Sequence, residues 1–404
     1  MLVASPSEAQ RRRGAQGPAA PTRGNVPAPA ETQSFESLSA QADAAREGDR
    51  VEEAVALYRR ALSLRPQWGE GWWYLATLSY ERDDCKEGAR AFREATKLQP
   101  KVGAAWALLG LCEFRLGEYD EAFDHIQQGR RLGVGDNVEL TRVMRFHEGL
   151  IANLKGDFER AQQTLGTLSF EGLKNEDLII ALGLAALRRG VLPRQIPHGY
   201  PDRDLVRRVG LAEHFAAQKN NPDAAREYEL LARDYPKAPG VQYAYGRHLL
   251  ANRDDEGALA AFAREIENYP KHALARLQIA YIKLKNRDPQ AALPFAEEAT
   301  RLHPRLPLSH FILGRALLET GQTARAIEEL EAVQRMTPDY PPTYFQLARA
   351  YSKANRKADA ERARETFARM NKQADDEAAQ GRPRADAVPT EGAEQTGTTP
   401  PPER

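Results

Sequence analysis

Three aromatic residues in the second half of the sequence are each followed, four positions later, by an arginine. The pairs are Tyr243/Arg247, Phe311/Arg315 and Phe345/Arg349. Residues four apart on an α-helix share one face, so each pair would present a ring beside a guanidinium group. Rings supply large anchoring areas, and guanidinium groups bind carboxylates through two parallel hydrogen bonds. The pairs indicate recognition of an acidic ligand, but the same spacing also suits core aromatics and arginines paired with acids such as Glu265 and Glu298.

Catalytic and metal-binding motifs are missing from the sequence. His147-Glu148 begins like the metal-binding helix of a zinc protease, but Ile151 stands where the second histidine is required. There is no glycine-rich phosphate loop, no dinucleotide-binding glycine pattern and no nucleophile elbow. Cys85 and Cys112 are too few for a disulfide framework or a four-ligand metal site, and the sequence leaves open whether they can pair. We expect no catalytic residue, metal or cofactor; the alternative is an enzyme with its site on a loop.

The elements that would position the aromatic and arginine residues follow a period of 34 residues. Prolines recur at this interval at Pro236, Pro270, Pro304 and Pro338, and Pro66 and Pro100 have the same spacing. Small residues lie 12 and 24 positions before each of the four later prolines: Ala224, Ala258, Ala292 and Ala326, and Ala212, Gly246, Ala280 and Gly314. Small residues let two helices approach closely, and a proline ends the second helix. The period predicts a stack of helix pairs.

This pattern resembles the tetratricopeptide repeat (TPR) family over most of residues 35–372. The resemblance implies an all-α solenoid, a right-handed superhelix of antiparallel helix pairs with about nine to ten repeats. The regular phase is lost after Leu132-Gly133, and prolines at positions 193, 197 and 201 prevent a second helix there. We therefore expect about nine helix pairs and one unpaired helix, from Asp177 to Arg189.

Composition divides the chain into five segments. Two repeat blocks, 35–190 and 204–372, flank a Pro-rich irregular loop or hinge at 191–203, whose role as hinge, lid or binding element is left open. The ends, 1–34 and 373–404, are polar and aperiodic, so we expect a disordered N-terminal arm and a disordered C-terminal tail.

The resemblance also implies where a partner would bind. In TPR proteins, fixed positions of the first helix of each pair line a concave groove that holds an extended peptide or a partner helix. The matching positions here are Trp73, Tyr80, Phe114, Phe146, Tyr243, Arg247, Tyr281, Phe311, Arg315, Phe345 and Arg349. The lysine and asparagine with which chaperone-tail TPR domains hold a terminal carboxylate are missing at these positions, so that clamp is not expected.

Net charge and apolar patterning narrow the class of partner. The formal net charge is zero, which disfavours nucleic acid and anionic membranes, and no apolar run is long enough to span a bilayer. We expect a non-catalytic scaffold that binds a protein or peptide partner, acidic or aromatic-containing. One alternative is an accessory subunit of a bacterial-type envelope, secretion or polysaccharide assembly machine. Another is a self-associating structural protein, although the polar end repeats favour a monomer.

The N-terminus leaves two compartments open. Ser7-Glu8-Ala9 before Gln10 looks like the end of a signal-peptide cleavage site, but the arginines at positions 11–13 follow the apolar start instead of preceding it. The protein is cytoplasmic if Met1 is the true start. It is periplasmic or secreted if residues 1–34 hold the remnant of a truncated signal peptide.

Overall fold

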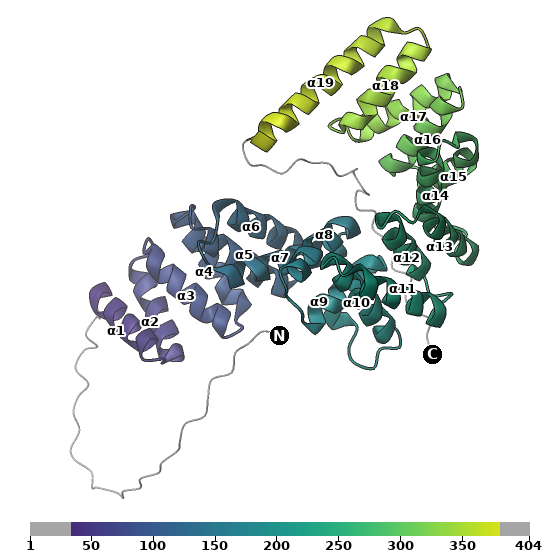
Figure 1. Cartoon of the computed structure of the whole chain (residues 1–404). Helices are drawn as coiled ribbons and strands as arrows, with labels where there is room; N and C mark the ends of the chain where they lie inside the picture. The colour runs from purple at the N-terminus through teal and green to yellow at the C-terminus, as the bar shows by residue number, and fades with distance from the viewer. Residues whose placement is uncertain (1–33, 380–404) are drawn as a thin grey trace, which may run out of the picture. The chain divides into compact units, whose positions relative to one another are not determined.

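A computed structural model describes residues 34–379, and the segments 1–33 and 380–404, where the sequence predicts disordered ends, lie outside the described residues. The described residues form nineteen α-helices and one short 3-10 helix, with no strand among them (Figure 1). Between residues 85 and 379, and again between residues 35 and 64, helices adjacent in sequence pack against one another, which confirms the expected all-α solenoid of helix pairs. The chain divides into two units, residues 1–75 and 76–404, and each is described by itself.

The first unit holds α1 (Phe35–Glu47), α2 (Val51–Leu64) and the first half of α3 (Gly69–Glu81). Ser34 caps α1, because its hydroxyl accepts a hydrogen bond from the Ser37 amide at 3.2 Å. The fully buried Tyr58 of α2 donates its hydroxyl hydrogen to Asp43 at 2.6 Å. These two helices form the first pair.

The second unit holds the second half of α3 and all later helices. Its helices are α4 (Cys85–Leu98), α5 (Gly103–Leu116), α6 (Tyr119–Leu132), α7 (Val138–Leu154), α8 (Phe158–Phe170), α9 (Glu176–Ala186), η1 (Pro193–Gln195), α10 (Arg203–Ala217), α11 (Asn221–Asp234), α12 (Val241–Ala251), α13 (Asp255–Asn268), α14 (Ala273–Lys285), α15 (Pro289–Leu302), α16 (Pro307–Glu319), α17 (Thr323–Met336), α18 (Pro341–Lys353) and α19 (Lys357–Ala379). Within the described residues α9 is the helix without a second helix of its own. The last helix extends to Ala379, beyond residue 372 where the sequence places the end of the repeats.

Small residues let the two helices of a regular pair approach. A Cβ atom on Gly314 of α16 would lie 2.7 Å from Cγ of Leu330 on α17. A Cβ on Gly246 of α12 would lie 2.7 Å from the ring of Phe262 on α13. Each glycine therefore makes room for one large, fully buried side chain of the second helix.

The repeat is interrupted between α9 and α10, where two backbones touch. A Cβ on Gly183 would lie 1.9 Å from the carbonyl oxygen of Val206, and one on Gly210 would lie 1.8 Å from that of Ile179. As residue numbers rise along α9, the partners on α10 fall, so the two helices run antiparallel. Only glycine allows this approach, because any Cβ would overlap a carbonyl group.

The irregular segment 191–203 takes the place of the missing helix. Leu192 is buried in the core formed mainly by α5–α9, and Ile196 is buried in the core of α9–α12. The Asn153 side chain of α7 donates to the carbonyl oxygens of Arg189 at 3.0 Å and Val191 at 2.9 Å. The segment thus packs into the cores on either side of it, and the Asn153 side chain holds its first residues by hydrogen bonds.

One unpaired helix changes which helix ends meet. The α10–α11 pair is antiparallel, because Tyr228 of α11 bonds Glu213 of α10, while Tyr235 bonds Asp204 at 2.8 Å. With α9 antiparallel to α10, the C-terminal end of α9 lies beside the start of α12. A Cβ on Gly240 would be 3.4 Å from Cδ2 of Leu187.

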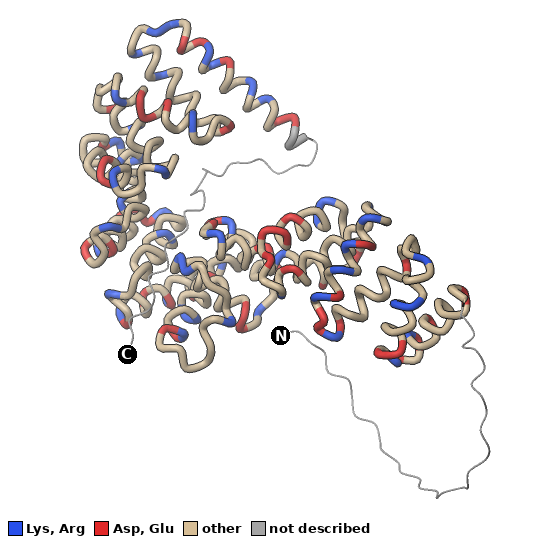
Figure 2. Tube along the Cα trace, turned by 180° about the vertical axis from the view of Figure 1, so that it is seen from behind, with Lys and Arg blue, Asp and Glu red and all other residues tan. Residues whose placement is uncertain are grey.

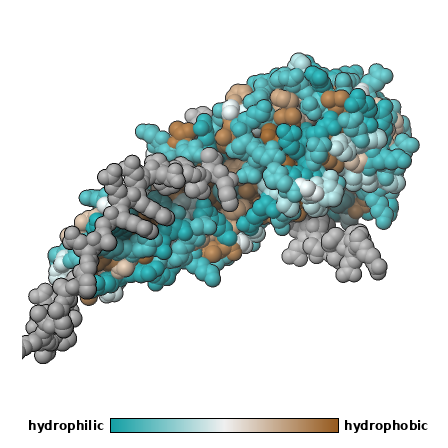
Figure 3. All heavy atoms as spheres, turned by 90° about the horizontal axis from the view of Figure 1, so that it is seen from below, coloured by the Kyte–Doolittle hydropathy of each residue, from teal (hydrophilic) through white to brown (hydrophobic). Residues whose placement is uncertain are grey.

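Basic and acidic residues are interspersed along the described part of the chain (Figure 2). The face seen in Figure 3 is largely hydrophilic, with hydrophobic residues in small separate patches. In the part of the chain that the structure describes, no helix is long and apolar enough to cross a membrane.

Candidate functional site

Two hollows that share Arg247 form a groove along α8, α10, α12 and α14, here called the α8–α14 groove. The first has a volume of about 450 Å³ and is lined by Glu159, Gln162, Gln163, Gly166, Thr167, Phe170, Leu182, Glu213, Ala217 and Arg247. The second has a volume of about 270 Å³ and is lined by Arg247, Leu250, Ala251, Gln278, Tyr281 and Lys285. Arg247 and Tyr281 are the two sequence-predicted residues that the structure brings together here.

A neutral side chain holds Arg247 in place. Its Nη1 donates to Oε1 of Gln162 at 2.7 Å. Gln162 is buried and donates from Nε2 to the carbonyl oxygen of Ala185 at 3.2 Å, so the α9 backbone orients the amide. Within the described residues Arg247 makes no ion pair. Its guanidinium group is therefore positioned in the groove without being neutralised by a direct carboxylate partner.

Two carboxylates share the first hollow with Arg247. Glu159 Oε1 forms an ion pair with Arg188 at 2.6 Å, while its Oε2 is buried without a hydrogen-bond partner. Glu213 accepts a hydrogen bond from the hydroxyl of Tyr228, and burial raises the pKa of that phenol, which keeps it a donor. The hollow thus holds a donor group at Arg247 beside two carboxylates that already have partners.

The other two predicted arginines differ from Arg247. Arg349 donates to Glu319 Oε1 at 2.8 Å and to Gln346 Oε1 at 2.9 Å. Arg315 makes no hydrogen bond or ion pair with the residues that the structure describes, and its guanidinium carbon lies 5.9 Å from the centre of the Phe311 ring. The three aromatic–arginine pairs are therefore not equivalent.

Three of the predicted aromatic residues lie in the core. Phe114, Tyr243 and Phe311 are 6%, 2% and 7% exposed, and each belongs to a buried apolar cluster. None of the three rings lines the α8–α14 groove.

Three more are partly buried. Tyr80 and Phe146 pack against the core formed mainly by α5–α9, and the Arg115 guanidinium lies 4.6 Å from the Tyr80 ring centre. Trp73 belongs to the first unit and is also partly buried. These residues lie outside the α8–α14 groove.

The remaining two rings are exposed to solvent. Tyr281 is 41% exposed and lines the groove. Phe345 is 47% exposed, and its ring centre lies 5.6 Å from that of Phe367 on α19. Only Tyr281 combines exposure with a place beside Arg247.

Sequence reasoning missed the contribution of α8. It considered only the first helix of each pair, so Gln162 and the 61% exposed Phe170 were not expected at a binding surface. The prolines after α9 were the available signal, because a missing second helix leaves α8 next to α10. His214 of α10 is within 2.9 Å of the Ser169 hydroxyl of α8.

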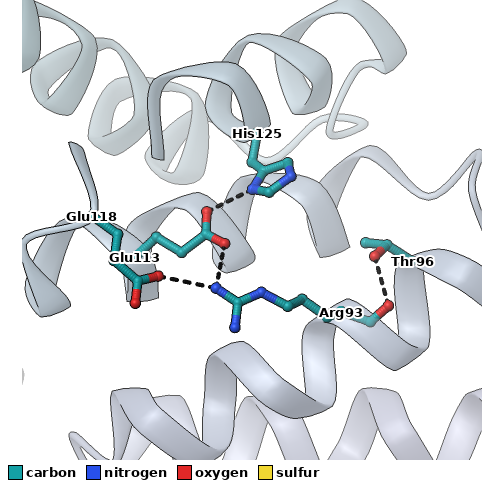
Figure 4. A network of polar contacts seen from close by, with 5 residues as sticks. All are labelled: Arg93, Thr96, Glu113, Glu118 and His125. Atoms are coloured by element: carbon teal, nitrogen blue, oxygen red, sulfur yellow. Dashed lines mark hydrogen bonds and ion pairs between the residues drawn. The ribbon is translucent and has the colours of Figure 1, made fainter. Parts of the chain in front are cut away.

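A second polar cluster, across α4, α5 and α6, has a different character (Figure 4). The fully buried Glu113 contacts Arg93 at 2.9 Å and His125 at 2.6 Å, and Arg93 also reaches Glu118 at 3.0 Å. Both carboxylate oxygens of Glu113 have partners, so the cluster is satisfied internally and joins consecutive repeats. No group of metal-ligating side chains occurs within residues 34–379.

The fold and the groove define a helical-repeat scaffold. Family models described as tetratricopeptide repeat match residues 74–133, 209–273, 277–341 and 317–382. The chain belongs to the tetratricopeptide repeat family. Members of this family are typically non-catalytic scaffolds for protein–protein interaction, in agreement with the class expected from the sequence. The matched stretches leave out residues 134–208, which contain α7–α9 and the interruption.

Several solved structures are similar to this chain at low identity. MamA from Desulfovibrio magneticus RS-1 is 21% identical, with a TM-score of 0.37 over 41% of this chain and 92% of that one. YrrB, a TPR protein with an unusual peptide-binding site, is 15% identical, with a TM-score of 0.37 over 41% and 84%. The Cut9-Hcn1 hetero-tetramer of APC/C is 11% identical, with a TM-score of 0.36 over 83% and 87%. No curated protein matches the sequence.

Proposed function

We propose that this protein is a non-catalytic scaffold that binds an extended segment of a partner protein in the α8–α14 groove. Arg247 receives a carboxylate of the partner, and the exposed rings of Tyr281 and Phe170 pack against its apolar or aromatic side chains. The observation that carries the proposal is the Gln162–Arg247 hydrogen bond of 2.7 Å, because it orients a guanidinium group without pairing it to a carboxylate.

The comparison with Arg349 supports this choice. A ligand carboxylate at Arg349 would have to displace Glu319, which lies 2.8 Å away. At Arg247 it would displace only a neutral amide, or add to it. An exposed ion pair contributes about 1 kcal/mol or less, so displacing Glu319 from an arginine at the rim would cost little. The cost is larger where the arginine is a partly buried anchor for the ligand. Arg315 is a secondary candidate on the same reasoning, because it makes no ion pair in the described part of the chain.

Selection from a phage-displayed library of random peptides tests the proposal on the full chain. We expect enrichment of peptides that carry Asp or Glu beside an aromatic residue. Arg247→Ala should weaken the binding of a selected peptide about thirtyfold, as expected for a central anchor. Arg349→Ala is the matched control and should change affinity less than about threefold. Equal losses in the two variants, or no enrichment at all, would contradict the proposal.

A further inference from the structure

A further hollow lies outside the α8–α14 groove. It has a volume of about 600 Å³ and lies where the end of α9 meets the turns before α12 and α14. Its walls are mostly apolar, with Leu187, Pro239, Tyr243 and Tyr269 among the lining residues. Volumes of this size are typical of sites for small organic ligands.

The hollow is a consequence of the interruption. The end of α9 reaches the start of α12 because, with one helix missing and the directions still alternating, the first helix α12 runs opposite to the first helix α9. No second helix of its own covers that end. The floor is fixed, because the Asn268 side chain donates to the carbonyl oxygen of Pro236 at 3.0 Å and the Tyr269 hydroxyl donates to that of Lys237. These bonds tie the turn before α14 to the turn before α12.

Within the described residues, the one carboxylate that lines the hollow, that of Glu265, already accepts hydrogen bonds at both oxygens. Glu265 is fully buried, and its carboxylate accepts hydrogen bonds from the amides of Gly240 at 3.0 Å and Tyr243 at 3.2 Å. It therefore caps the N-terminus of α12, where the helix dipole favours negative charge. Both oxygens are in use, so Glu265 offers no free acceptor to a ligand.

The unused polar groups are donors. The Ala275 amide donates to His272 Nδ1 at 3.1 Å, so the proton of the neutral ring is on Nε2. Nε2 lies 3.7 Å from Glu265 Oε1, which is too long for a hydrogen bond. Burial lowers the pKa of His272 to about 4, so the ring is neutral at physiological pH. Lys271 at the rim makes no ion pair within residues 34–379, whereas Arg188, which lines the wall near α9, is already paired with Glu159 at 2.6 Å.

We infer that this hollow is a second binding site, for a small organic molecule with an apolar body and a hydrogen-bond-acceptor head, either a carboxylate or a neutral carbonyl. The body lies against Leu187, Tyr243 and Tyr269. The head accepts from His272 Nε2, and a carboxylate also faces Lys271. The site is separate from the peptide groove and does not depend on the function proposed for it.

Three probes with one apolar body test the inference on the full chain by titration calorimetry: 3-phenylpropionate, 3-phenylpropanamide and 3-phenylpropylamine. We expect the acid and the amide to bind and the amine to show no binding, because its head group has only donors. Arg247→Ala should leave these affinities unchanged. No binding of any probe, or equal binding of all three, would overturn the inference.

Two variants locate the bound head group. His272→Asp keeps a side-chain acceptor to cap α14 but removes the donor, so both ligands should bind at least tenfold more weakly. Lys271→Glu should weaken the acid at least about fivefold and the amide much less. Lys237→Glu, one repeat period earlier and outside the hollow, is the matched control and should have no effect. If His272→Asp fails to fold, the comparison of Lys271→Glu with Lys237→Glu is decisive. Equal affinities of these two variants for 3-phenylpropionate would overturn the assignment of the site.

Discussion

Glycines let neighbouring helices approach closely both in the regular repeats from α12 to α17 and at the interruption around α9 and α10, but the groups that they contact differ. In the regular pairs a glycine faces a side chain, as Gly314 faces Leu330. At the interruption Gly183 and Gly210 each face a carbonyl group. Regular pairs fill their interfaces, whereas both sites proposed here adjoin the interruption. Both proposed binding sites therefore lie where the period of the repeats is broken.

The largest expected effect compares these two kinds of glycine. Gly210→Ala places a methyl group against backbone that cannot move aside, so we expect a loss of about 3 kcal/mol in the free energy of unfolding. In Gly314→Ala the Leu330 side chain can shift, and the better helix propensity of alanine offsets part of the strain, so we expect a loss below about 1 kcal/mol. Urea unfolding followed by circular dichroism measures both. Similar midpoint shifts would show that the two interfaces do not differ.

Acidification is expected to affect two partly buried histidines, His147 and His272, differently from His310, which is paired with a carboxylate. Burial lowers the pKa of His147 and of His272 to about 4. The unfolded chain then binds more protons below its histidine pKa of about 6.5, and stability falls as the pH drops from about 6.5 towards 4, by up to roughly 3 kcal/mol per group. The hydrogen bond that His310 donates to the Glu329 carboxylate raises the pKa of His310, so its contribution is present below pH 6.5 and is lost as the pH rises through the raised value.

Urea unfolding at pH 5 and pH 8 checks these signs. His272→Asn keeps a capping residue and should be less sensitive to acid than the natural protein. His310→Gln should lose stability at pH 5 and little at pH 8. The reverse pattern in either variant would contradict the assigned protonation states.

A smaller loss of stability is expected when the hydrogen bonds that hold the start of segment 191–203 are removed. Asn153→Ala removes the donor to the carbonyl oxygens of Arg189 and Val191 and should cost about 2 kcal/mol. Asn252→Ala is the control, because its side chain bonds only locally, to His248, and should cost less than about 0.5 kcal/mol. Hydrogen exchange of the Val191 region should accelerate in the first variant alone. Unchanged exchange there would show that the segment does not depend on Asn153.

The sequence was sufficient for the regular part of the fold. Proline and small residues at a fixed period determine where helices end and how closely they approach, so the pairs and the unpaired helix could be predicted. The site could be predicted only in part. Arg247 and Tyr281 follow from the repeat position, but the burial of Tyr243 and Phe311 depends on how far each ring turns into the core, which a position in a repeat does not determine.

The role of α8 could not be predicted from the repeat pattern. Gln162 and Phe170 line the groove because the missing helix after α9 brings α8 beside α10 and α12. Whether such a loss opens a surface or closes it depends on the packing of segment 191–203. The contacts of Leu192 and Ile196 depend on the tertiary structure, and no periodicity in the sequence encodes them.

Photo-crosslinking of a selected peptide tests the central claim most directly. Benzoylphenylalanine is introduced at Gln163 or Tyr281, which line the α8–α14 groove, or at Lys86 on α4, an exposed control position. We expect crosslinks at Gln163 and Tyr281 that disappear when Arg247→Ala is added, and none at Lys86. Crosslinking at Lys86 with none in the groove, or crosslinks that survive the loss of Arg247, would contradict it.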